Sequence, residues 1–324
     1  MEILKIPVLR SPVMVIAFSG WNDAGEAASG AASHLLGCWT DPAFDVVPEL
    51  IAEVDPEEFY DFQVNRPMVY VDDSSIRNLT WPGTQVFALA TPSLDHDFIV
   101  VRGVEPSMKW KTFSSDLLDL ADDCEVDLVI TLGSMLADTP HTRPITVSGS
   151  GAHPDIAKRL GVEISKYEGP TGILGVIQDA CIRRGIDAIS LWAAIPHYAS
   201  NSPSPKASLA LVNALEDFLE VSLPQGDLPE ESSSWRTANA TVYAVRCWCS
   251  TTGREYWIYV PRNIGQKGDA LEAIAWTVQL TITDPEYIYR QGDVILAKYS
   301  TTSKECRPYH LNAEQYVKLL KAES

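Results

Sequence analysis

Three short apolar runs constrain the fold of this chain more than any other feature. They lie at residues 13–18 (VMVIAF), 127–132 (DLVITL) and 188–194 (AISLWAA). Apolar runs without alternation are typical of strands buried on both faces, as in parallel sheets. Helical patterns separate such runs, for example at residues 26–36 and 107–124. The sequence therefore predicts the α/β class, a mostly parallel sheet with helices on both faces.

Each of the three runs ends in a polar loop. We expect the second strand to end at Gly133 and residues 148–151 (SGSG) to form a flexible connector. The three loops span residues 20–25, 134–144 and 196–205. Because the carboxyl ends of parallel strands meet at one edge of a sheet, we expect these loops to form a common rim.

The rim loops contain residue types that could support acid–base chemistry. The catalytic candidates are Asp138, His141 and His197, since an imidazole titrates near neutrality and a carboxylate can orient it. Asp23 and Arg143 complete this candidate enzyme site. The alternative, which we favour without geometry, is that these side chains cap helices and tie loops together. Asn22 or Asp23 in particular is placed to cap the helix that follows.

Other kinds of site find little support in the sequence. The glycine fingerprint of dinucleotide sites, the phosphate loop, the His-Glu-x-x-His pattern and the serine elbow are all absent. We therefore expect no cofactor and no metal. The six cysteines form no C-x-x-C pair, so we expect small buried side chains. Five tryptophans are expected in the core: Trp21, Trp39, Trp81, Trp110 and Trp192.

Charge divides the chain into two parts. The net charge is −18, but residues 235–324 carry 11 basic and 9 acidic residues, which leaves 14 and 34 for residues 1–234. Such an acidic body argues against nucleic acid or an anionic membrane as a partner. We predict an α/β domain at 1–224, a polar linker at 225–234 and a small α+β module at 235–324. Alternating strands at 241–245 and 255–260 predict a hairpin within this module.

The amino-terminal stretch resembles no secretion signal, and no apolar run reaches the length of a membrane span, so we expect a cytoplasmic protein.

Six sequence blocks, in order, resemble the bacterial branch of the proteasome assembly chaperone 2 family over residues 1–231. They are GWNDAG (20–25), YDFQVNRP (60–67), GVEP (103–106), ADTPHTRP (137–144), YEGPTGILG (167–175) and SLWAAIPHYASNSPSPKASLAL (190–211). The resemblance implies a fold similar to purine nucleoside phosphorylases and a homo-oligomer such as a trimer. It implies proteasome-assembly work in eukaryotic and archaeal relatives, and no established activity in the bacterial branch. Residues 235–324 resemble no family we recognise.

Within these blocks, several side chains are candidates for contacts with a ligand or a partner: Trp21, Asn22, Asp23, Arg143, Thr171 and Tyr198. The chain departs from chaperones that dock on proteasome rings, because it ends in KAES instead of a hydrophobic-Tyr-any motif. Our first hypothesis is an oligomeric protein-binding or chaperone-like factor whose partners include itself and other proteins such as proteasome subunits. The alternative is a small-molecule enzyme, a hydrolase or a nucleoside-phosphorylase-like transferase, with its site at the rim.

Overall fold

The computed structural model describes residues 1–39, 44–72, 75–141, 143–151, 153–199 and 203–238, and four further strands at 242–249, 254–261, 287–289 and 297–298. The chain divides into two compact units. The first comprises Met1–Ala137, Pro144–Ile195 and Ala199–Trp235, and the second comprises Asp138–Arg143, Pro196–Tyr198 and Arg236–Ser324.

The first unit contains eleven described strands: β1 (Glu2–Ile3), β2 (Val13–Ser19), β3 (Glu49–Glu53), β4 (Met68–Val71), β5 (Arg77–Thr80), β6 (Thr84–Leu89), β7 (Phe98–Val104), β8 (Leu128–Ala137), β9 (Val147–Gly151), β10 (Glu163–Ile164) and β11 (Ala188–Pro196). Its helices are η1 (Ala24–Glu26), α1 (Ala27–Gly37), α2 (Pro56–Phe59), α3 (Trp110–Asp123), α4 (Pro154–Leu160), α5 (Ile173–Arg184) and α6 (Pro205–Leu219), and α7 (Leu228–Ala238) begins in it.

Nine strands form one sheet in the order β1-β3-β6-β7-β2-β8-β11-β9-β10. At its centre, β2 runs parallel to both β7 and β8. Antiparallel pairs extend the sheet on both sides, through β7–β6–β3–β1 at one end and β11–β9 at the other. The predicted α/β class, with parallel strands at the centre, is confirmed.

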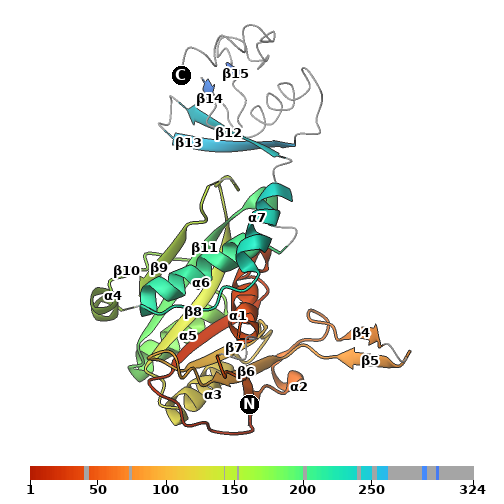
Figure 1. Cartoon of the computed structure of the whole chain (residues 1–324), viewed down its shortest axis with the longest axis vertical. Helices are drawn as coiled ribbons and strands as arrows, with labels where there is room; N and C mark the ends of the chain where they lie inside the picture. Colours follow the sequence, from red (N-terminus) through yellow and green to blue (C-terminus); the bar gives the residue numbers. More distant parts are fainter. Residues whose placement is uncertain are drawn as a thin grey trace. The chain divides into compact units, whose positions relative to one another are not determined.

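Alternating side chains of β2 pack in two separate hydrophobic cores. Val13, Val15 and Ala17 pack with buried residues of α1 and α6 on one face of the sheet. Their neighbours Met14, Ile16 and Phe18 pack with α3 and α5 on the other face. This arrangement explains why the run at 13–18 has no polar residue, since both faces of the strand are covered (Figure 1).

Several predicted boundaries were wrong for identifiable reasons. Strand β8 continues past Gly133 to Ala137, because the amide of Ser134 donates to the Asn22 carbonyl (2.8 Å) and prolongs the extended chain. Gly133 is a packing glycine: a Cβ there would lie 2.7 Å from the ring of Trp192. Residues 148–151 are not a connector but part of β9, where Gly151 lets the backbone approach helix α4.

The predicted linker at 225–234 is largely helical. Helix α7 begins at Leu228 and passes through Trp235, two residues seven positions apart that are both buried. This spacing puts both side chains on one stripe of the helix. The polar residues between them, which suggested a linker, occupy the other faces.

The second unit contains a four-stranded sheet in the order β13-β12-β14-β15, with bounds β12 (Val242–Cys249), β13 (Arg254–Pro261), β14 (Tyr287–Tyr289) and β15 (Ala297–Lys298). Its described pairs are antiparallel. The predicted hairpin is confirmed as β12–β13. The helices predicted at 268–282 and 311–322 lie outside the described residues.

The exposed fractions of the cysteine and tryptophan side chains test the predictions that they are buried. Cys38, Cys124 and Cys181 are free and buried, and desolvation raises the pKa of Cys38 and of Cys181 to about 12. The side chains of the other three cysteines lie outside the description. The expectation of core tryptophans was wrong for Trp21 and Trp81, which are 68% and 48% exposed.

Candidate functional site

The loop after β2 is built around the buried carboxylate of Asp23. It accepts hydrogen bonds from the backbone amides of Ala28 (2.8 Å) and Ser29 (3.2 Å) and from the Ser29 hydroxyl. Asp23 therefore satisfies two amides in the first turn of α1, the function predicted for a cap, although Glu26 occupies the N-cap position itself. Burial raises the pKa of Asp23 more than the bonds from Ser29 and Ala28 lower it.

Asn22 links this loop to two other segments through Glu105. The Asn22 side-chain amide donates to the Glu105 carboxylate at 3.0 Å, and the amide of Ile173 donates to the same oxygen at 2.9 Å. Glu105 thus places negative charge at the amino end of α5, where the helix dipole favours it. Gly172 must be glycine here, because a Cβ would lie 2.3 Å from the Asn22 amide nitrogen.

The other rim candidates of the first unit lie around this network. Thr171 precedes Gly172, and its hydroxyl lies 3.4 Å from the Gly172 carbonyl oxygen. Trp21 extends into solvent beside the buried pair Asn22 and Asp23. The structure therefore brings Asn22, Asp23 and the segment 171–172 together, and Asn22 and Asp23 make bonds that hold the fold.

The remaining candidates belong to the second unit. Asp138, His141 and Arg143 lie on one loop of it, and His197 and Tyr198 lie in the 3-10 helix η2 (His197–Ala199). His141 is buried, whereas Asp138, Arg143 and His197 are exposed. The amide of Arg143 donates to the Pro140 carbonyl at 3.1 Å, which closes a turn. The enzyme hypothesis, which needs these residues and Asp23 in one site, stays a prediction, as does the likeness to phosphorylases.

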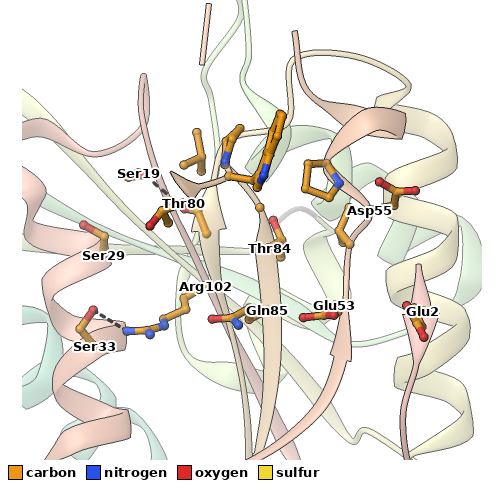
Figure 2. Close-up of a pocket in the computed structure, with 17 residues that line it drawn as sticks. Glu2, Ser19, Ser29, Ser33, Glu53, Asp55, Thr80, Thr84, Gln85 and Arg102 are labelled. Atoms are coloured by element: carbon orange, nitrogen blue, oxygen red, sulfur yellow. Dashed lines mark hydrogen bonds between the residues drawn. The ribbon is translucent and has the colours of Figure 1, made fainter. Parts of the chain in front are cut away.

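The first unit also contains a pocket of about 680 Å³, a size typical of binding pockets, that sequence reasoning missed. It lies beside α1, over β6, β3 and β1, and reaches the turn between β5 and β6 (Figure 2). The Arg102 guanidinium points to the Ser33 hydroxyl (3.4 Å) and lies 5.6 Å from the centroid of the Phe87 ring.

Four polar side chains cross the floor of this pocket in a row. Arg102 pairs with Gln85, Gln85 with Glu53, and Glu53 with Glu2, each on the neighbouring strand. Directly paired residues share a face of the sheet, so all four side chains project into the pocket (Figure 2). The sequence signal was limited to Gln85 and Arg102, polar residues among the apolar residues of β6 and β7, and the strand order that aligns them with Glu53 and Glu2 was not visible there.

Strands β4 and β5 form a two-stranded sheet of their own, which projects from the nine-stranded sheet (Figure 1). We call residues 64–72 and 75–81 the arm. Its large apolar side chains are 45–72% exposed: Val64, Met68, Val69, Tyr70, Val71, Ile76, Leu79 and Trp81. An isolated two-stranded sheet is marginally stable in water, and exposed apolar patches mark interaction surfaces. The arm is therefore a candidate protein interface.

Metal clusters and membrane-spanning helices are both absent from the part of the chain that the structure describes. No cluster of three or more His, Cys, Asp or Glu side chains there could hold a metal ion. None of the described helices is long and apolar enough to cross a membrane.

Comparison with known proteins gives consistent matches. The sequence model of the PAC2 family matches residues 17–241. A crystal structure of a PAC2 family protein from Streptomyces avermitilis is 49% identical, with a TM-score of 0.64 over 71% of this chain and 94% of that one. A proteasome-assembly chaperone homologue from Mycobacterium tuberculosis is 45% identical, with a TM-score of 0.63 over 70% and 94%.

An archaeal homologue of proteasome-assembly chaperone, PbaA from Pyrococcus furiosus, shares the fold at 19% identity, with a TM-score of 0.51 over 72% of this chain and 92% of that one. No curated protein matches the chain.

Proposed function

Because this chain belongs to the PAC2 family, as its six sequence blocks predicted, we propose that it is a cytoplasmic, chaperone-like protein-binding factor. It self-associates and binds other proteins, proteasome subunits among them, and the arm is the surface through which it does so. The proteasome-assembly chaperone homologue from Mycobacterium tuberculosis supports this class of function.

The exposed apolar arm is the observation that carries the proposal. All four side chains of β4 (MVYV) are exposed, so both faces of this strand meet water in the single chain. Burial of a valine or a residue of similar size stabilises a complex by about 1.5–3 kcal/mol. Several such side chains lie on one projecting hairpin, so burial of this surface by a partner would stabilise a complex more than burial of a surface with few exposed apolar residues.

The network around Asp23 is consistent with this assignment. Its carboxylate accepts bonds from α1, and the neighbouring Asn22 is held by Glu105. These bonds give Asn22 and Asp23 a role in holding the fold.

Binding of the full chain to purified proteasome subunits, measured by sedimentation velocity, tests the proposal. Val71→Asp places a charge on the arm, and Val8→Asp is the matched control, because Val8 is fully exposed outside the arm. We expect Val71→Asp to weaken binding about tenfold to one-hundredfold, the equivalent of about 1.4–3 kcal/mol, and Val8→Asp to leave it unchanged. Absence of binding by the unmodified chain, or equal losses in both variants, would contradict the proposal.

A further inference from the structure

The two faces of the arm differ in charge. Val71 pairs with Arg77 and Val69 pairs with Leu79 across the hairpin, so these four side chains share one face. The other face carries Met68, Tyr70, Asn78 and Thr80. Among the paired strand residues, one face is thus apolar except for the exposed Arg77. Outside the strands the arm also carries the exposed Arg66 and, after Val71, Asp72, whose carboxylate accepts from the Ile76 amide (2.9 Å) and the Asn78 side chain (3.0 Å).

Arg77 makes no ion pair within the part of the chain that the structure describes. The arm also lies on a body whose residues 1–234 carry 14 basic and 34 acidic residues. A lone guanidinium at the end of an apolar face is suited to a partner surface that combines apolar contacts with a carboxylate.

The pocket beside the arm offers that combination. Glu2 and Glu53 face each other directly on β1 and β3, and neither has an ion-pair partner among the described residues. Like charges directly opposite each other in a sheet are destabilising. Apolar side chains of the pocket lie nearby, including Pro56 and Pro82. A cation between the two carboxylates would relieve their repulsion.

We propose that the arm of one copy docks in the pocket of a second copy, with Arg77 of the first against Glu53 and Glu2 of the second. This inference rests on the proposed function and names one partner of the arm. Charge complementarity points to a second copy, because each chain carries both the apolar face with Arg77 and the carboxylates of Glu2 and Glu53, which have no ion pair among the described residues. The pocket is lined by the end of the same arm and the two residues after it, at residues 80–83, and strands β4 and β5 project from the nine-stranded sheet (Figure 1).

Such a contact joins different surfaces of the two copies. Head-to-tail contacts of this kind close into rings when the rotation permits, and a trimer is one such ring. The row of charged side chains also makes one side of the pocket negative and the other positive. The carboxylates lie on β3 and β1, whereas Arg102 lies two strands away from Glu53. At about 4.8 Å between neighbouring strands, this separation is roughly 10 Å. An incoming cation is therefore directed to the β1 side of the pocket.

A charge-swap experiment on the full chain tests this contact. Self-association is measured by sedimentation equilibrium for the unmodified chain, Arg77→Glu, Glu53→Arg and the double variant. We expect each single reversal to raise the dissociation constant about tenfold or more, as for a partly desolvated charge pair that loses a partner. The double variant, which restores opposite charges, should recover most of the affinity. Lys158→Glu on α4 reverses an exposed charge elsewhere and should change nothing.

The outcomes separate this proposal from the proposed function. Failure of the double variant to recover affinity, while Val71→Asp still weakens self-association, would overturn the pocket as the docking site and leave the arm as an interface. A chain that is monomeric at all concentrations but binds proteasome subunits through Arg77 would overturn the second copy as occupant. Circular dichroism melts of all variants exclude unfolding as the cause.

Discussion

Substitution of Asp23 tests whether this residue holds the fold. Asp23→Ala removes the acceptor for the amides of Ala28 and Ser29, and Ala28 is fully buried. A hydrogen bond to a charged group contributes about 1.5–3 kcal/mol, and loss of a helix cap costs about 0.5–2 kcal/mol. Burial of the carboxylate opposes these gains, since it raises the pKa of Asp23. We therefore expect a net loss of about 2 kcal/mol in the free energy of unfolding.

The substitution Asp23→Asn removes the negative charge but keeps an oxygen that can accept hydrogen bonds. The amide oxygen of asparagine still accepts from Ala28, so we expect a smaller loss, about 1 kcal/mol or less. The pKa of Asp23 is raised in the folded state above its unfolded value near 3.8. The folded state thus holds the proton more tightly, and this contribution to stability is present at low pH and lost as pH rises through the folded pKa. The deficit of Asp23→Asn should therefore be larger at pH 4 than at pH 7.

Urea denaturation of the full chain, followed by far-ultraviolet circular dichroism at both pH values, measures these differences. The reasoning is refuted if Asp23→Ala costs less than about 0.5 kcal/mol, the lower limit for removal of a cap. It is equally refuted if the asparagine variant loses as much as the alanine variant at pH 7.

Three further substitutions probe the fold around the site. Phe113→Ala should lower the free energy of unfolding by about 3–5 kcal/mol in urea titrations, because its fully buried ring contacts two other aromatic rings. Gly103→Ala should cost about 1–3 kcal/mol in thermal melts, since its Cβ would meet backbone at 2.2 Å, whereas Gly37→Ala has open space and serves as the control. Asp97 is buried, which alone would raise its pKa, but hydrogen bonds from Arg10 and from the Thr91 amide, with the charge of Arg10, together outweigh this and lower the pKa. The stabilisation by Asp97 should be complete above its unfolded pKa and should disappear as pH falls through the lowered folded value, so Asp97→Asn and the unmodified chain should converge in acid.

The buried elements of the fold were predictable from the sequence. The run at 13–18 has no polar residue because each of its faces enters a separate core, and this double burial leaves a clear pattern. The boundaries were less predictable. Gly133 looked like the end of a strand, yet it is required by the ring of Trp192, a contact between residues 59 positions apart.

The pocket and the arm could not be derived from local patterns. Glu53, Gln85 and Arg102 become neighbours only through the strand order β3-β6-β7, which a single sequence does not display. The apolar composition of β4 (MVYV) by itself favours burial of its side chains. That its side chains are exposed follows from the position of β4 outside the main sheet.

Amide hydrogen exchange in the arm tests most directly whether this surface binds proteins. A two-stranded hairpin without a partner exchanges rapidly, because its strands are marginally stable alone. We predict that peptides covering residues 68–80 become protected as the concentration of the chain rises or as proteasome subunits are added. Peptides covering α4 should not change. Exchange in the arm that stays fast in every assembled state would contradict the account.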